Sequence, residues 1–197
     1  MLTSAAVFTG SFLLALALPA DEVTRNKDEL QAARGFEFQG IGFGSTAADI
    51  KRKWPKCQEN SVLFETDNNR KDDYNFLMMN IERYHVSKSI ASIPAECVVF
   101  DVYDNQVIRI NIVYLTAELE KTDGVYVIED KLTKLIGIPN DTISVPDKPR
   151  LCFWNIREAQ RRFWVTTMPE VVTLEAYNTE MDAVIMKKKN THLFRRE

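Results

Sequence analysis

The sequence predicts an α+β fold in which short helices pack on one face of antiparallel sheet. Three observations support this class: two helical stripes near 46–54 and 125–136, an alternating hairpin pattern at 97–115, and short alternating segments in the last third. Strands that come in runs beside isolated helices are typical of α+β proteins. Because a helix precedes strands twice, the sequence leaves open a tandem repeat with halves at 36–118 and 119–187.

The N-terminal segment is apolar and uncharged up to Asp21. Its apolar part, residues 5–18, matches the core of a secretory signal peptide and is short for a membrane span. We therefore expect residues 1–20 to be a signal peptide and the protein to be secreted or periplasmic. A retained membrane anchor is the alternative, since no Lys or Arg precedes Arg25. Residues 21–35 are polar and are interpreted as a linker or a short helix.

The folded domain is expected to span 36–187 and to open with a short strand at 36–39. A helix follows, because Thr46 and Asp49 have the spacing of a capping box, with Ser45 as the alternative cap. Its apolar face consists of Ala47, Ile50 and Trp54, and Pro55 ends it.

The next region gives weaker signals. We expect a strand at 62–65, a polar loop at 67–73 and, in the ambiguous stretch 74–90, a strand near 74–80.

The clearest pattern is the β-hairpin at 97–115. Two alternating apolar runs flank Asp104-Asn105, a typical turn pair. If Ile108 and Ile110 face the core, the residues between and beside them should face away, namely Val107, Arg109 and Asn111.

A second helix and four strands complete the domain. The helix carries a stripe at 3, 4 and 3 spacing (Val125, Ile128, Leu132, Leu135) and ends at Gly137. The strands are expected at 151–155, 162–167, 171–177 and 183–187, joined by connections short enough for an antiparallel meander. Residues 188–197 are interpreted as a solvated basic tail, with attraction to anionic lipid or a partner as the alternative.

Several kinds of chemistry lack their motifs. The glycine-rich stretch "GIGFGST" has no lysine before Ser45, and position 45 is not the third glycine of a dinucleotide loop, so we expect no nucleotide cofactor. The two histidines, His85 and His192, and three separated cysteines form no metal-ligand spacing. A nucleophilic pair of Cys152 and His85 has no local motif, so we expect neither a metal nor a catalytic residue. The net charge of −3 gives no sign of nucleic-acid binding.

The odd cysteine count suggests one disulfide and one free thiol in an exported protein. We expect the disulfide between Cys57 and Cys97. A Cys97–Cys152 pair is the main alternative, and three reduced thiols remain if the protein is not exported.

A surface for a protein partner is expected on the strand at 162–167. Arg162, Trp164 and Thr166 share one of its faces, opposite to Phe163 and Val165. Tryptophan and arginine dominate binding hot spots, so Arg162 and Trp164 are the candidate partner-binding residues. The alternative is packing, in which Trp154 and Trp164 cover each other and an arginine stacks on them.

The stretches "FQGIGFGSTAADIKRKWP" and "LTKLIGIP" resemble parts of small exported modules. In these modules a strand, a glycine turn and a capped helix precede an antiparallel sheet. Small envelope lipoproteins of outer-membrane assembly and the β-lactamase inhibitor protein family are built in this way, the latter as a tandem repeat. The resemblance implies a non-catalytic, secreted or envelope binding scaffold. An uncharacterised secreted hydrolase and a membrane-tethered envelope component are the alternatives.

Overall fold

The computed structural model describes residues 23–59, 81–87, 95–146 and 148–193 of the 197-residue chain. The predicted signal peptide at 1–20, the strands at 62–65 and 74–80 and the loop at 67–73 lie outside these residues. Within them, no helix is long and apolar enough to cross a membrane.

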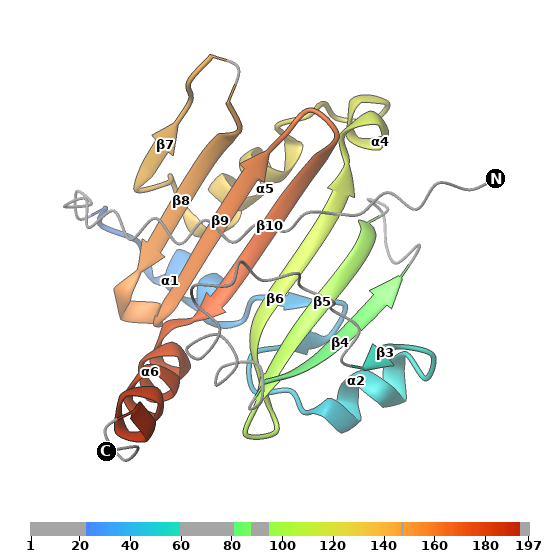
Figure 1. The fold of residues 1–197 in the computed structure, drawn as a ribbon. Coiled ribbons are helices and arrows are strands. Elements are labelled where there is room, and N and C mark those ends of the chain that lie inside the picture. Colours follow the sequence, from blue (N-terminus) through green and yellow to red (C-terminus); the bar gives the residue numbers. More distant parts are fainter. Residues whose placement is uncertain (1–22, 60–80, 88–94, 147, 194–197) are drawn as a thin grey trace.

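One large antiparallel sheet organises the described chain (Figure 1). From edge to edge its eight strands are β3 (Gln58–Glu59), β4 (Glu82–Ser87), β5 (Ala95–Tyr103), β6 (Gln106–Leu115), β10 (Val171–Asn178), β9 (Arg161–Thr167), β8 (Arg150–Ile156) and β7 (Asp141–Ile143). A small second sheet pairs β1 (Glu37–Phe38) with β2 (Ile41–Gly42). The helices are α1 (Lys27–Arg34), α2 (Ala47–Lys53), α4 (Thr116–Glu120), α5 (Val127–Ile136) and α6 (Thr179–Leu193), with a 3-10 turn, η1 (Arg157–Ala159). The α+β class predicted from the sequence is therefore confirmed.

The helix-then-strands order occurs twice along the chain. Helix α2 precedes β3 to β6, and helix α5 precedes β7 to β10. The last strands of the two sets, β6 and β10, pair with each other in the middle of the sheet, with Leu174 opposite Ile112. We call this pairing the central seam.

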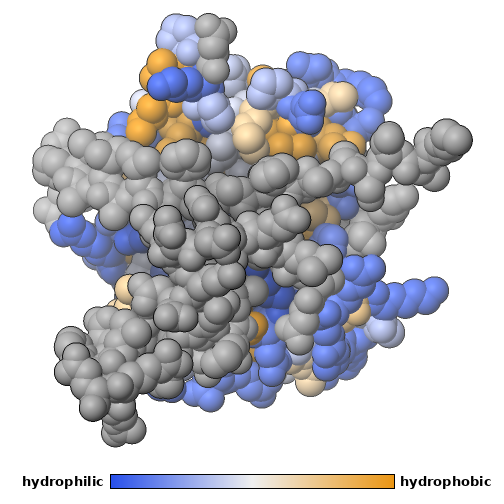
Figure 2. All heavy atoms as spheres, viewed as in Figure 1, coloured by the Kyte–Doolittle hydropathy of each residue, from blue (hydrophilic) through white to orange (hydrophobic). Residues whose placement is uncertain are grey.

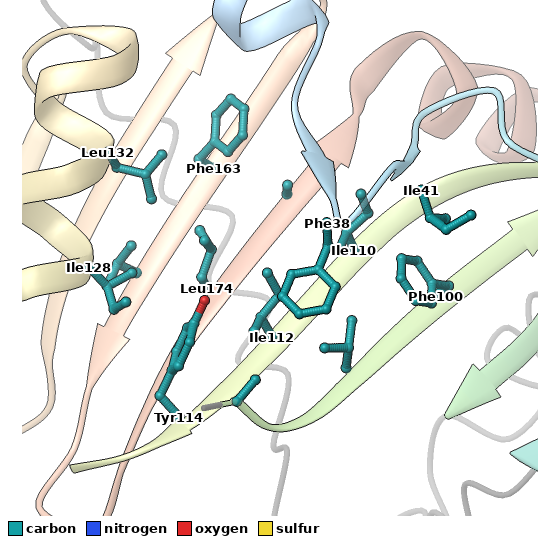
Figure 3. Close-up of a cluster of buried hydrophobic side chains, with 14 of the residues drawn as sticks. Phe38, Ile41, Phe100, Ile110, Ile112, Tyr114, Ile128, Leu132, Phe163 and Leu174 are labelled. Carbon is teal, nitrogen blue, oxygen red and sulfur yellow. The ribbon is translucent and has the colours of Figure 1, made fainter. Parts of the chain in front are cut away.

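The main core lies between the sheet and one layer of short elements behind it (Figures 1 and 3). Ile128 and Leu132 of α5 point at the β9–β10 half, where Phe163 is fully buried. Phe38 of the small hairpin covers the other half, beside Ile110 and Phe100. Each large strand thus turns alternate residues toward this layer, and we call that side the helix face.

Residues 21–35 are not only a linker, since 27–34 form α1. Asn26 accepts hydrogen bonds from the backbone of Asp28 and Glu29, and Glu29 reaches back to the amide of Asn26. The preceding Arg25 is buried and donates to the carbonyls of Ile136 and Ile138. This arginine ties the start of the described chain to the end of α5.

Helix α2 forms as predicted. The Thr46 side chain accepts from the amide of Asp49, and the Asp49 carboxylate accepts from the amide of Thr46. Ile50 is fully buried, and the Trp54 ring stacks on Phe100 at 5.6 Å between centroids. Helix, turn and sheet are therefore joined through the face predicted from the sequence.

The predicted hairpin is β5 and β6, but its alternation is broken at Ile108. Asp104 and Asn105 both have positive φ, as a tight hairpin turn requires. A register shift between Asp101 and Val102 then places Val102 opposite Val107, so Ile108 is the extra residue of a β-bulge.

Because of this bulge, the predicted orientations of Val107 and Ile108 are wrong. Val107 lies in the main core, whereas Ile108 joins Tyr103 and Ile185 in a second cluster on the other side. Arg109 and Asn111 follow the prediction, because both lie between the core residues of β6.

The stripe of α5 also differs from the prediction at one position. Ile128, Leu132 and Ile136 are buried, but Leu135 is 48% exposed. The spacing i, i+4, i+8 therefore describes the buried face. Gly137 ends the helix with φ 83°, a conformation that favours glycine.

The segment 183–187 is not a strand, since α6 runs from Thr179 to Leu193 and also includes part of the predicted tail. The Asn178 side chain accepts hydrogen bonds from the amides of Glu180 and Met181, which starts the helix directly after β10. Both edges of β10 are already paired, by β6 and β9. Ile185 of α6 packs against Tyr103 and Ile108.

Candidate functional site

The candidate site lies on the side of the sheet opposite the helix face, which we call the open face. On β8 and β9 the residues Cys152, Trp154, Phe163 and Val165 belong to the main core. Their neighbours along the strands therefore point the other way: Leu151, Phe153, Asn155, Arg162, Trp164 and Thr166. All six are partly exposed.

The predicted residues Arg162 and Trp164 both lie on the open face, together with Phe153. Phe153 is directly opposite Trp164, and their rings meet edge-on at 4.8 Å between centroids. The Arg162 guanidinium lies over the Phe153 ring at 5.9 Å. We call these three residues the Arg162 cluster. Trp154 is fully buried on the helix face, so it does not cover Trp164.

A row of polar residues crosses the open face beside this cluster. Read along the register, its members are Arg83, Asp101, Arg109, Tyr177, Arg162 and Asn155, and we call it the charged row. Asp101 is 4% exposed and contacts Arg83 at 2.7 Å and Arg109 at 3.5 Å. Arg109 contacts Glu175 at 2.6 Å. Three of the six members of the row are thus tied into ion pairs.

Arg162 differs from the other arginines of this row. It forms no ion pair with another described residue, whereas Arg83 and Arg109 both do. Its Nε is buried without a hydrogen-bond partner among the described residues, as is the Nε of Arg109. Asp182 of α6 attracts it electrostatically, but burial raises the pKa of that carboxyl. Among the described residues, Arg162 therefore has the Phe153 ring beside it and Asp182 as a nearby charge, without a salt bridge.

A second polar cluster lies under β8 on the helix face. The buried Glu129 carboxylate accepts from Arg150 Nε at 3.0 Å, Cys152 Sγ at 3.1 Å and Thr167 Oγ1 at 3.1 Å. Burial raises the pKa of Cys152 to about 11, so the thiol stays protonated near neutral pH. The arrangement is that of a satisfied buried carboxylate, and it offers no activated nucleophile.

Cys152 and His85 are not brought together. His85 is on β4 and lies opposite Val99 on the open face, whereas Cys152 is in the main core on the helix face. The order from β4 to β8 places five strand spacings between them, about 24 Å at the usual separation. The structure therefore offers no Cys–His nucleophile at these positions.

The predicted disulfide between Cys57 and Cys97 is not formed, because all three cysteines are free thiols. Cys57 packs against the main core. Cys97 precedes the core residue Val98 on β5, so its side chain points to the open face. The two thiols are thus on opposite sides of the sheet. Burial raises the pKa of Cys97 to about 11.

The glycine turn before α2 uses its amides internally. Gly42 N–H donates to Ser45 Oγ, Ser45 N–H to the Gly42 carbonyl, and Gly44 N–H to the Val107 carbonyl. Thr46 N–H donates to the Asp49 carboxylate. These donors hold the turn and the helix cap, so they do not converge on an anion. Among the described residues no group of three or more His, Cys, Asp or Glu side chains could hold a metal ion.

The sequence did not predict that Phe153 and the charged row belong to the candidate site. Phe153 lies between the buried residues Cys152 and Trp154 on β8. If 151–155 is taken as a strand, alternation therefore places Phe153 on the face opposite to Cys152 and Trp154, which is the open face. Its contact with Trp164 depends on the β8–β9 register, which η1 and its left-handed Gln160 set.

No family model matches the chain. No curated protein matches it either. Among solved structures, the chain is similar to a DUF4309 family protein (YjgB) from Bacillus subtilis. The two share 11% identity with a TM-score of 0.44, over 77% of this chain and 93% of the other.

Proposed function

We propose that the chain is an exported, non-catalytic scaffold that binds a protein partner through the Arg162 cluster. The observation that carries the proposal is a guanidinium and two aromatic rings held together on the open face. Arginine and tryptophan supply much of the binding energy in protein interfaces, especially when neighbouring residues fix their orientation. Here two paired strands, β8 and β9, provide that support.

The surface next to the cluster favours an interface as well. Ile143 on the edge strand β7 lies opposite Leu151, and it is 37% exposed. Val145, just after that strand, is 43% exposed. Figure 2 shows hydrophobic residues at this end of the molecule and hydrophilic ones around α2 and β3. A partner that covers the cluster would therefore also cover apolar surface, whose burial contributes to binding.

Export is the part of the proposal that depends on the sequence alone. It follows from the apolar segment before Asp21, which lies outside the described residues. The mass of the exported protein tests it, since loss of about 20 residues is expected for a cleaved signal peptide. A mass that retains this segment would favour the tethered alternative.

The binding role is tested by comparative affinity capture from the native envelope fraction. The wild-type chain is compared with an Arg162→Ala/Trp164→Ala variant and with a matched control, Arg157→Ala/Tyr126→Ala. The control also removes one arginine and one aromatic residue, both exposed and outside the cluster. Far-UV circular dichroism establishes that all three proteins are folded.

We expect a partner that the wild type and the control both retain and that the cluster variant loses. Because truncation of a hot-spot residue costs about 2 kcal/mol or more, the double variant should lower the affinity at least thirtyfold. Equal capture by all three proteins would refute binding through the cluster. If only the control variant lost the partner, the interface would lie near Arg157 or Tyr126 and not at the cluster.

A further inference from the structure

Among the described residues of the charged row, the ion pairs include Arg83 and Arg109 but not Arg162. Arg83 pairs with Asp101, and Arg109 pairs with both Asp101 and Glu175. The hydroxyl of Tyr177 also donates to Glu175. The carboxylates of Asp101 and Glu175 are thereby used within the charged row.

Arg162 lies one position beyond these pairs. The Tyr177 side chain separates it from Arg109, since Tyr177 is opposite both residues in the register. Arg109 also lies over the Tyr177 ring at 5.0 Å. No hydrogen bond or salt bridge joins the partly exposed Arg162 side chain to another described residue, although a guanidinium normally finds acceptors. Its Nε is buried, but its terminal nitrogens are not among the buried unpartnered atoms, so they are the donors that a partner's acceptor could reach.

The residues around Arg162 indicate which kind of acceptor group on a partner would bind there. A guanidinium presents its donors in a fork that matches a carboxylate. Asn155 is the cross-strand neighbour of Arg162 on the same face, and its side-chain amide can donate as well. Phe153 and Trp164 stand next to this position and offer apolar ring surface.

A polyanion fits this surface less well than a single carboxylate does. Asp101, Glu175 and Asp182 lie on or beside the same face, and the net charge of the chain is −3. Asp101 and Glu175 are already paired with Arg83 and Arg109, so these arginines are not free to neutralise the many phosphates of nucleic acid or of an anionic membrane. The single guanidinium of Arg162 matches one carboxylate carried by a mostly apolar segment.

We infer that the Arg162 cluster binds an aspartate or glutamate side chain of an extended protein segment, with an apolar neighbour of that residue against Trp164. This inference rests on the proposed binding function and specifies the partner's chemistry. The Arg162 guanidinium supplies the charge-assisted hydrogen bonds, and the Phe153–Trp164 pair supplies the apolar contact.

The test uses two short peptides and the full chain with ¹⁵N-labelled tryptophan. The probes are acetyl-Gly-Glu-Leu-Gly-amide and its Gln counterpart, titrated while the indole N–H signals are recorded by NMR. Trp154 is an internal reference, because it is fully buried and its Nε1 donates to the Gly137 carbonyl at 2.9 Å. The Trp164 signal is assigned with a Trp164→Phe variant.

We expect the Glu peptide to shift the Trp164 signal and not the Trp154 signal. The Gln peptide should bind about tenfold more weakly, because hydrogen bonds to a charged acceptor are the stronger ones. Arg162→Gln should remove the preference for Glu, whereas the control Arg157→Gln should keep it. Raising the salt concentration should weaken binding of the Glu peptide only.

Three results would overturn the inference. The first is equal binding of the Glu and Gln peptides, and the second is an equally large Trp164 shift with inorganic phosphate. The third is no shift with either peptide while capture of the native partner still requires Arg162 and Trp164. In each case the binding function would stand on the capture experiment, which uses different readouts and variants.

Discussion

The junction of Arg25, α1 and α5 predicts a large effect for the smallest substitution, Gly137→Ala. Gly137 has φ 83° and ψ −178°, a region almost restricted to glycine, where a side chain costs on the order of 1–3 kcal/mol. An added Cβ would also lie 2.7 Å from Arg25 Nη1 and 2.8 Å from Glu29 Oε1. The Arg25 guanidinium cannot move away freely, since it donates to the Ile136 and Ile138 carbonyls.

The two effects together should lower the free energy of unfolding by about 3–5 kcal/mol, since disturbing a hydrogen bond from a charged donor costs about 1.5–3 kcal/mol. For a chain of this size the midpoint of thermal unfolding should fall by roughly 10 °C. Urea and thermal unfolding, followed by circular dichroism, measure both quantities.

Gly124→Ala is the matched control for this prediction. Gly124 has φ 91°, but an added Cβ there would meet nothing within 4 Å. The control therefore reports the backbone strain without the collision, and it should cost about 1–3 kcal/mol. If Gly137→Ala is no more destabilising than Gly124→Ala, Arg25 does not hold the end of α5 as described. In an Arg25→Ala background the difference between the two glycine variants should shrink.

Three further predictions concern α6, the thiols and the Asp182 carboxyl. Ile185→Asp should release α6 and increase its proteolysis, while Met186→Asp, at a position 47% exposed, should leave it protected. Thiol counting under denaturing, non-reducing conditions should give three groups, and a count of one would restore a disulfide. Burial raises the pKa of Asp182, so its ionised form is disfavoured in the folded protein. Asp182→Asn should therefore raise the free energy of unfolding at pH 7. This gain should decrease as the pH falls through the folded-state pKa of Asp182, because the wild type then binds a proton; a gain independent of pH would contradict it.

Features that depend on local sequence were predicted well. The α2 capping box needs only the Thr46–Asp49 spacing, and the β5–β6 turn needs only Asp104 and Asn105. The open-face position of Arg162 and Trp164 follows from alternation within one strand. The α+β class followed because these local signals agree with one another.

Features that depend on a distant segment were not predicted. The bulge at Ile108 is a property of the β5–β6 pair, and its benefit is a contact with Ile185 far along the chain. The short apolar run around Ile185 suits a strand as well as a helix, and the preceding Asn178 decides between them. The partners of Arg109, on β5 and β10, could not be inferred before the strand order was known.

The central seam has a consequence for how the chain folds. Most pairings within each set of strands join neighbours along the chain, whereas the seam joins residues as distant as Arg109 and Glu175, 66 positions apart. Closing the longer loop costs more entropy before any contact repays it. We therefore expect the two meanders to form first from nearer contacts and their union at Ile112 and Leu174 to come late. Weakening that union should mainly speed unfolding and leave the rate of folding nearly unchanged.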